Sequence, residues 1–254
     1  MTFDVSGDAY DTFMGRFARV LAPAFADFSG VHSGLTVLDV GCGSGILTEE
    51  LARRLGGGSV AAADPSPLVE ACAARVPEAD VRTAPAEALP WADESFDAAL
   101  AQLVLHFLEK PVVGLAEMRR VVRAGGVVAA CSWNFPEMTL LQTFWQAARE
   151  VVPSAPGEAL QFGTLDELAE LGREAGLESI ETARLDVSAG YQSFDDLWSS
   201  FELGVGPAGE FCTSLGPEMR KGLRAEYRRR LGDLSGSFTL SARAWAVRGQ
   251  VPGD

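Results

Sequence analysis

The sequence predicts an α/β fold in which a mostly parallel sheet carries helices on both faces. Five apolar runs of strand length alternate with helical patterns, which is typical of βαβ units. These runs are Thr36–Val40, Ser59–Ala63, Ala79–Thr83, Phe96–Gln102 and Gly126–Trp133. Three glycines at alternate positions follow the first run and open a helix. Two later strand patterns, Leu177–Val187 and Ser237–Val247, enclose helical segments, so we expect the sheet to finish with an antiparallel pair.

Helical patterns connect these strands. Leucines recur every four residues between Leu47 and Leu55, and Gly56–Gly58 ends that helix. The run Asp64-Pro65-Ser66-Pro67 predicts the next helix start, with Ser66 as its cap. Further helices are predicted at Pro111–Val122, 138–152, 165–175, 193–203 and 217–231.

The chain is predicted to form one domain over residues 1–254. Residues 1–30 form helical leader segments that precede the sheet, with an apolar stripe that favours packing against it. Residues 134–163 and 190–234 interrupt the strand rhythm and are expected to form a helical cap. No internal repeat or low-complexity linker suggests a second domain.

Composition limits the classes of function. The formal net charge of −14 repels polyanions, so nucleic acid is a poor candidate partner. No stretch approaches the roughly 18 apolar residues of a membrane span, and the N-terminus lacks a signal pattern, so we expect a cytoplasmic protein without membrane association. Four scattered cysteines and two histidines predict free thiols and no metal site. A homodimer is left open.

The glycine turn predicts the kind of ligand. Glycines between a strand and a helix let the backbone approach a ligand, and the helix N-terminus adds N–H donors. Residues 41–45 read Gly-Cys-Gly-Ser-Gly, whereas dinucleotide loops usually read GxGxxG. Asp39 precedes the turn and suits an ammonium group better than a pyrophosphate, which disfavours an NAD-dependent dehydrogenase. Asp64 ends the next strand, where a carboxylate can accept both ribose hydroxyls. S-adenosylmethionine, a nucleoside that carries an amino acid and no phosphate, meets these requirements.

Several ordered motifs carry a family resemblance. They are "VLDVGCGSG", "AADPSP", "APAEALPWADESFDAALAQLVLHF" and "RRVVRAGGVVAACSW", which together span roughly residues 36–133. The segment "AYDTFMGRFARVLA" at 9–22 is similar to the leader helix of one subgroup. The sequence resembles the class I S-adenosylmethionine-dependent methyltransferases, particularly the small-molecule branch similar to the ubiquinone and menaquinone biosynthesis methyltransferases. The resemblance implies a Rossmann-like seven-stranded sheet of order 3-2-1-4-5-7-6, with the last strand antiparallel.

The resemblance also implies which residues bind S-adenosylmethionine. Those around the methionine part and the sulfonium are Asp39, Gly41, Gly43, Gly45, Gln102 and Leu103. Those around the adenosine are Asp64, Pro65, Ser66, Ala86 and Glu87. In this set Asp64 holds the ribose, and Ala86 and Glu87 border the adenine. The family often places an aspartate where this chain has Pro85, so adenine recognition is expected to use Glu87, the backbone at Ala86 or water.

Three further side chains are candidates for roles at the site. His106 is the only histidine near the predicted cofactor edge, so it is the candidate general base; packing or gating is the alternative. Arg16 in the leader could pair with the cofactor carboxylate through a bidentate contact, or form an ordinary surface ion pair. Tyr10 could cover the methyl-transfer site.

Aromatic residues concentrate in the predicted cap segments. Trp133, Phe144 and Phe162 are the candidate substrate contacts, and they favour a mostly apolar substrate. Packing within the cap explains them equally well.

The sequence therefore predicts a methyltransferase that moves a methyl group from S-adenosylmethionine to O, N or C of a small, largely apolar molecule. Positioning carries much of such a displacement, so no fixed catalytic motif is required. Two alternatives keep the cofactor and fold: a non-methylating reaction such as cyclisation or decarboxylation, and a binding or regulatory protein.

Overall fold

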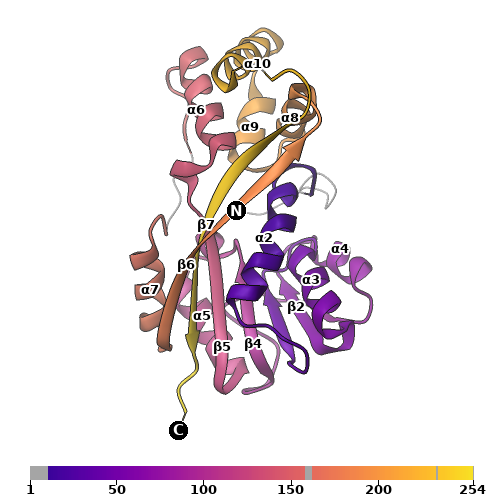
Figure 1. Cartoon of the computed structure of the whole chain (residues 1–254), viewed down its shortest axis with the longest axis vertical. Coiled ribbons are helices and arrows are strands. Elements are labelled where there is room, and N and C mark those ends of the chain that lie inside the picture. Colours follow the sequence, from indigo (N-terminus) through magenta and orange to yellow (C-terminus); the bar gives the residue numbers. More distant parts are fainter. Residues whose placement is uncertain (1–10, 158–161, 233, 254) are drawn as a thin grey trace.

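The structure, a computed structural model, describes residues 11–157, 162–232 and 234–253. The described residues contain a seven-stranded sheet of order β3-β2-β1-β4-β5-β7-β6 (Figure 1). The strands are β1 (Val37–Val40), β2 (Val60–Asp64), β3 (Asp80–Thr83), β4 (Phe96–Gln102), β5 (Val122–Trp133), β6 (Glu178–Tyr191) and β7 (Phe238–Gln250). β7 pairs antiparallel with both β5 and β6, and the other pairs are parallel. The predicted fold class and strand order are confirmed.

Helices cover both faces of the sheet. They are α2 (Gly15–Phe28), α3 (Ile46–Leu55), α4 (Val69–Arg75), α5 (Pro111–Val121), α6 (Thr139–Val151), α7 (Leu165–Glu174), α8 (Phe194–Phe201), α9 (Gly206–Ser214) and α10 (Pro217–Leu231), with short 3-10 turns at η1 (Gly57–Ser59), η2 (Leu105–Phe107) and η3 (Phe135–Glu137). α2 and α3 pack in one apolar cluster with alternate strand residues such as Val37. α5 and α7 pack in the other, with the intervening residues such as Leu38. This alternation follows from the two-residue period of side chains along a strand.

β6 and β7 extend beyond the other strands and reach the helices α6, α8, α9 and α10 (Figure 1). We call these four helices the cap; they lie within residues 134–163 and 190–234. β6 and β7 are paired from Glu178 and Gln250 to Tyr191 and Phe238, which makes them the longest pair of the sheet. The cap therefore rests on a continuous extension of the sheet rather than on a separate linker.

Side-chain caps explain where two of the helices begin. Thr164 caps α7 in a capping box with Glu167, and Ser193 accepts a hydrogen bond from the backbone N–H of Asp196 at the start of α8. The predicted cap at Ser66 is wrong, because α4 begins later and the Ser66 hydroxyl donates to Asp64 instead. The sequence prediction also missed α9, whose glycines and proline are poor helix formers.

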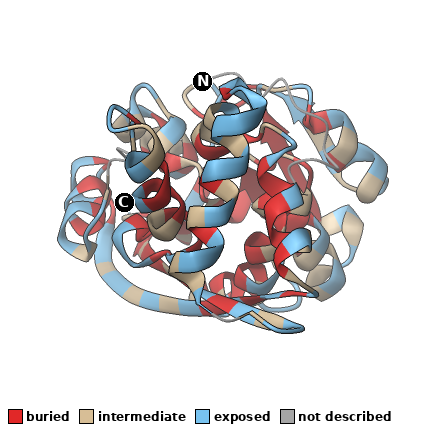
Figure 2. Cartoon of the chain, turned by 90° about the horizontal axis from the view of Figure 1, so that it is seen from above, coloured by how far each residue is buried: buried red, intermediate tan, exposed pale blue. Residues whose placement is uncertain are grey.

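The buried core follows the sheet and the inner faces of the helices, whereas the outer helix faces are exposed (Figure 2). Its largest fully buried side chains come from the leader helix and the cap as well as from the sheet, for example Phe17, Phe144 and Tyr227. All four cysteines are buried and free. No helix among the described residues has the length and apolar character needed to cross a bilayer.

Candidate active site

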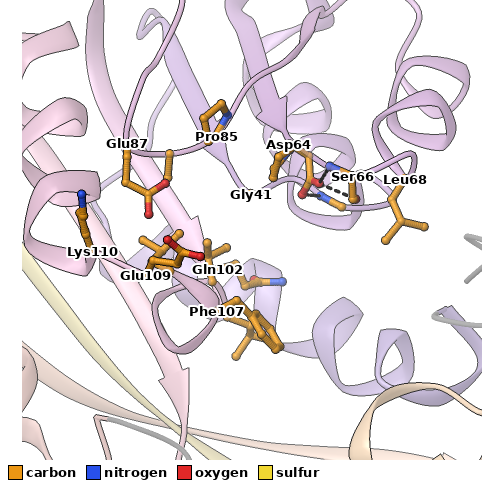
Figure 3. Close-up of a pocket in the computed structure, with 16 residues that line it drawn as sticks. Gly41, Asp64, Ser66, Leu68, Pro85, Glu87, Gln102, Phe107, Glu109 and Lys110 are labelled. Atoms are coloured by element: carbon orange, nitrogen blue, oxygen red, sulfur yellow. Dashed lines mark hydrogen bonds between the residues drawn. The ribbon is translucent and has the colours of Figure 1, made fainter. Parts of the chain in front are cut away.

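A cavity of about 450 Å³ lies at the carboxyl ends of the parallel strands β1, β2 and β4 (Figure 3). We call it the main cavity. It is lined by Gly41, Gly43, Asp64, Pro65, Ser66, Leu68, Pro85, Ala86, Glu87, Gln102, Leu103, Val104, Phe107, Leu108, Glu109 and Lys110. This is the edge at which open α/β sheets bind ligands.

A smaller cavity of about 40 Å³, which we call the inner cavity, adjoins the main cavity. It is lined by Ala18, Asp39, Gly41, Cys42, Gly43, Ser44, Ile46, Leu47, Gln102 and Leu103. Four residues belong to both linings, so the two cavities meet at the glycine turn and the end of β4. Together they provide a long recess with a wide end beside Asp64 and a narrow end beside Asp39.

The glycines of the turn have three different tasks. Gly41 has φ 72°, and an added Cβ would collide with the side chain of Val104. Gly43 has φ 51° and open space where its Cβ would stand, so its backbone forms cavity wall. Gly45 has φ 87° and packs against the backbone and sulfur of Cys72, and it is absent from both linings. The first and second glycines therefore face the recess, whereas Gly45 holds the helix against α4.

Asp64 organises the wide end of the recess. One carboxylate oxygen accepts the Gly43 N–H at 2.8 Å, and the other accepts the Ser66 N–H at 2.8 Å and the Ser66 hydroxyl at 2.5 Å. A carboxylate offers about four acceptor sites, and these bonds use three of them. Rotation of the Ser66 hydroxyl releases a further site. Asp64 can therefore fix the turn and still accept a ligand hydroxyl.

Asp39 lies at the narrow end and is buried. Its carboxylate accepts a hydrogen bond from the Thr48 hydroxyl at 2.6 Å. Burial raises the pKa of Asp39 from 3.8 to about 7, against the opposing effect of the Thr48 hydrogen bond. A ligand cation in the inner cavity would favour the ionised carboxylate and lower this pKa again.

Gln102 supplies an acceptor where the cavities meet. Its side-chain N–H donates to the backbone oxygen of Ala18 at 3.3 Å. Its Oε1 is one of only two buried side-chain polar atoms without a hydrogen-bond partner within the described ranges. Such an orphaned acceptor is costly unless a ligand or water satisfies it. Leu103 follows with a left-handed backbone (φ 65°), a strained conformation for a branched side chain that is typical of functional sites.

The end of the main cavity that lies away from Asp64 is lined by both apolar and charged residues. Pro85 and Ala86 form part of the wall, and Figure 3 shows the lining residues Glu87, Glu109 and Lys110 on the side away from Asp64 and Leu68. Sequence reasoning named Ala86 and Glu87 but missed Glu109 and Lys110. Their position after the fourth strand was the available signal, because the carboxyl ends of parallel strands meet at one edge.

The S-adenosylmethionine assignment passes a test of fit. The recess offers an acceptor for hydroxyl groups at Asp64, an orphaned acceptor at Gln102 and a buried carboxyl group at Asp39. These groups match the ribose and the ammonium of an adenosyl amino acid, and Gly43 leaves room for a ligand against the backbone. None of them requires a phosphate group in the ligand.

Of the two leader candidates, only Arg16 lies within the described residues. Tyr10 lies outside the described residues. Arg16 lines neither cavity and instead makes two hydrogen bonds to the carboxylate of Asp196, at 3.0 and 2.5 Å. Its guanidinium group is therefore already engaged by a carboxylate of the cap, and its expected pairing with the cofactor is not supported.

His106 lies in η2, immediately beyond the end of β4. Its Nδ1 is 3.4 Å from the Ser132 hydroxyl, and its ring packs against Phe107 and Phe135. Burial lowers the pKa of His106 from 6.5 to about 4, so the ring is neutral at pH 7. It is absent from the linings of both cavities, although its neighbour Phe107 belongs to the main cavity.

The three aromatic candidates for substrate contact are packed into the protein. Trp133 is buried and meets Phe17 edge to face, with ring centroids 6.1 Å apart. Phe144 is fully buried and stacks on Phe201 at 4.4 Å. Phe162 is partly buried against the apolar cluster of α5 and α7. None of the three lines the main or inner cavity.

Comparison with known proteins agrees with this geometry. Residues 38–130 match the family model described as a methyltransferase domain. The matched segment contains the glycine turn, Asp64 and Gln102. The match covers less than half of the chain, and the strand order 3-2-1-4-5-7-6 describes the whole sheet.

In this segment and in its strand order, the chain is similar to the class I S-adenosylmethionine-dependent methyltransferases. It is 32% identical over 157 residues to a ubiquinone biosynthesis O-methyltransferase of Cereibacter sphaeroides, a match that covers 58% of this chain and 62% of the relative. The chain thus matches less than two thirds of the length of this curated relative.

Two solved structures show the same fold. The 4+2 cyclase SpnF superposes with a TM-score of 0.60 at 20% identity, covering 93% of this chain and 82% of SpnF. A geranyl diphosphate C-methyltransferase from Streptomyces coelicolor superposes with a TM-score of 0.54 at 16% identity, covering 93% of this chain and 80% of the enzyme. At these identities the likeness concerns the fold.

Proposed function

We propose that this protein transfers a methyl group from S-adenosylmethionine to an O, N or C atom of a small, largely apolar molecule. The observation that carries this proposal is the pair of neighbouring cavities, one lined by Asp64 and the other by Asp39, with the orphaned Oε1 of Gln102 on a residue that lines both. The matched methyltransferase domain and the ubiquinone O-methyltransferase relative support it. The S-adenosylhomocysteine bound to the geranyl diphosphate C-methyltransferase supports the choice of cofactor.

Each end of the recess has a proposed task. Asp64 accepts the ribose hydroxyls, and Pro65, Ser66, Ala86 and Glu87 border the adenosine. Gln102 Oε1 and the carboxyl group of Asp39 receive the ammonium of the methionine part. The bound cofactor supplies the methyl group on a positively charged sulfur, and the protein aligns the acceptor and excludes water from it.

We also propose His106 as the group that accepts a proton from the methyl acceptor. A neutral ring at pH 7 has the protonation state that this task requires. Its place beside Phe107 puts it one residue from the cavity wall.

The chemical character of the substrate follows from the relatives and the walls. A ubiquinone biosynthesis enzyme acts on a small molecule, and the main cavity has apolar walls at Leu103, Val104 and Leu108. Small-molecule binding sites are mostly apolar, with a few placed polar groups. We also propose a cytoplasmic location, supported by four buried free thiols, which are typical of a reducing compartment.

The test uses S-adenosylmethionine labelled in its methyl group. The purified protein is incubated with a small-molecule extract, and the products are examined by mass spectrometry. We expect a labelled product and an equal amount of S-adenosylhomocysteine. Cofactor binding without either product would contradict methyl transfer.

The likeness to the cyclase SpnF favours one second candidate. In that case the recess binds S-adenosylmethionine, and the protein catalyses a reaction such as a cyclisation without methyl transfer. The same incubation distinguishes the two. A substrate that is converted without change in mass and without release of S-adenosylhomocysteine would support the second candidate.

A further inference from the structure

We propose that Asp11 and Arg16 are positioning residues that clamp the leader helix α2 between the glycine turn and the cap, and thereby set the methionine end of the cofactor site. This inference rests on the proposed function, because it assigns the inner cavity to the methionine part. Residues 11–13 are helical and lead directly into α2. One contact is made to the glycine turn and α4, and the other to β6 and the cap helix α8.

Asp11 joins the leader to the glycine turn. Its carboxylate accepts hydrogen bonds from the hydroxyl of Ser44 at 2.6 Å and from the guanidinium group of Arg75 at 2.5 Å. Arg19 adds a third bond at 2.7 Å from within α2. The Asp11 side chain is only 14% exposed, so these bonds are better shielded from water than an ordinary surface pair. Ser44 belongs to the turn and lines the inner cavity, and Arg75 ends α4.

Arg16 joins the leader to the cap. Its guanidinium group makes a two-pronged contact with Asp196 of α8 and donates to the backbone oxygen of Gly190 in β6 at 3.1 Å. It also lies 4.9 Å from the ring centroid of Tyr191. The backbone N–H of Gln192 donates to the same Asp196 carboxylate at 2.9 Å, which fixes that partner in turn. Bidentate arginine–carboxylate pairs have specific geometry, so this contact defines the position of the helix as well as holding it.

The helix held by the two contacts also reaches the proposed cofactor site, two residues after Arg16. Ala18 lines the inner cavity, and its backbone oxygen accepts the side-chain N–H of Gln102. That bond orients the Gln102 amide and leaves its Oε1 as the orphaned acceptor. The described lining of the main cavity contains no residue of α2. A displaced leader would therefore disturb the methionine end and spare the adenosine end.

The expected difference between the methionine end and the adenosine end provides a test, because a general loss of structure would weaken binding at both ends. Calorimetric titrations with S-adenosylhomocysteine and with adenosine are compared for the wild type, Asp11→Asn, Arg16→Gln and Asp196→Asn. We expect each variant to bind S-adenosylhomocysteine about tenfold more weakly and to bind adenosine as the wild type does. The double variant Arg16→Gln with Asp196→Asn should be no weaker than either single variant, because both remove the same contact.

A control variant separates the clamp from surface charge in general. Arg173→Gln removes an exposed ion pair with Glu170 within α7, and it should bind both ligands like the wild type. Equal weakening of adenosine and S-adenosylhomocysteine in the Asp11 and Arg16 variants would overturn the proposal. Wild-type affinity for S-adenosylhomocysteine in those variants would overturn it as well.

Hydrogen exchange provides a readout that does not depend on ligand binding. The peptide spanning α2 should exchange about tenfold faster in the clamp variants, while the α5 peptide (Pro111–Val121) should exchange at the wild-type rate. If the wild-type protein binds neither ligand, the proposed function fails, and the exchange rates alone decide whether the clamp exists. Unchanged exchange over α2 would then reject it.

Discussion

The recess and the cap stand on the same sheet but are built in opposite ways. The recess is walled by backbone turns and by polar groups that keep accepting capacity, such as Asp64 and the Oε1 of Gln102. The cap is filled by interlocking rings, with Phe144 stacked on Phe201 at an interplanar angle of 12° and Tyr227 meeting both edge to face. The recess is therefore arranged to receive a ligand, whereas the centre of the cap is arranged to be stable.

The largest expected effect comes from emptying the cap. Phe144→Ala should lower the free energy of unfolding by about 3–5 kcal/mol, because it removes a fully buried ring and leaves a cavity. Chemical denaturation measures this change. S-adenosylhomocysteine affinity should remain within about twofold under conditions where the variant is folded, because the ring lies outside both cavities. A stable variant that has lost affinity would place Phe144 in the site after all.

Asp39 provides the next effect, and it depends on pH. Its raised pKa means that the folded protein binds more protons than the unfolded chain between about pH 4 and 7, so this group lowers stability as the pH rises through that range. Asp39→Asn removes that dependence. The difference in unfolding free energy between the variant and the wild type should therefore shift in favour of the variant by roughly 2–4 kcal/mol as the pH rises from 4 to 8.

Denaturation curves across this pH range test the Asp39 prediction. Asp93→Asn replaces a carboxylate that is 76% exposed and should reproduce the wild-type pH dependence. Parallel curves for Asp39→Asn and the wild type would show that Asp39 is not the buried titrating group. The same Asn variant should bind S-adenosylhomocysteine more weakly, since it loses the negative charge that faces the ammonium.

The next prediction concerns ligand binding in the recess, at Asp64. Asp64→Asn should weaken S-adenosylhomocysteine binding by about 1–3 kcal/mol, because the ribose hydroxyls lose a charged acceptor. The amide keeps one oxygen to accept bonds from the turn, so less structural damage is expected than from alanine. Calorimetric titration measures the loss. An affinity equal to that of the wild type would remove Asp64 from the ribose site.

His106 should have the smallest effect on folding and binding. His106→Gln is expected to leave S-adenosylhomocysteine affinity unchanged, because the ring lines neither cavity. As proton acceptor, its loss should lower turnover of the identified substrate by about 10²–10⁴. Normal turnover would leave the ring with its packing against Phe107 and Phe135.

The same contrast explains what could be predicted from the sequence. The recess depends on local signals: a strand, alternate glycines and an acidic strand end. These signals singled out Gly41, Gly43 and Asp64, which line the main cavity. The resemblance to the class I enzymes added the strand order, which pairing confirms. Strand ends were less certain, since β5 begins at Val122 rather than Gly126.

The cap and the leader depend on contacts between distant parts of the chain. Arg16 and Asp196 are 180 residues apart, so no local pattern could pair them. The sequence does not distinguish an aromatic residue of the core from one that lines a binding site. Only its packing in the structure shows that Phe144 belongs to the core. The Ser66 cap failed for a related reason, because Asp64 competes for its hydroxyl.

Titration of the wild-type protein with S-adenosylhomocysteine and, separately, with NADH tests most directly whether the recess is an adenosyl amino acid site. We expect S-adenosylhomocysteine to bind at one site per chain, and we expect no heat of binding from NADH. Binding of NADH without binding of S-adenosylhomocysteine would contradict the assignment of Asp39, Asp64 and Gln102.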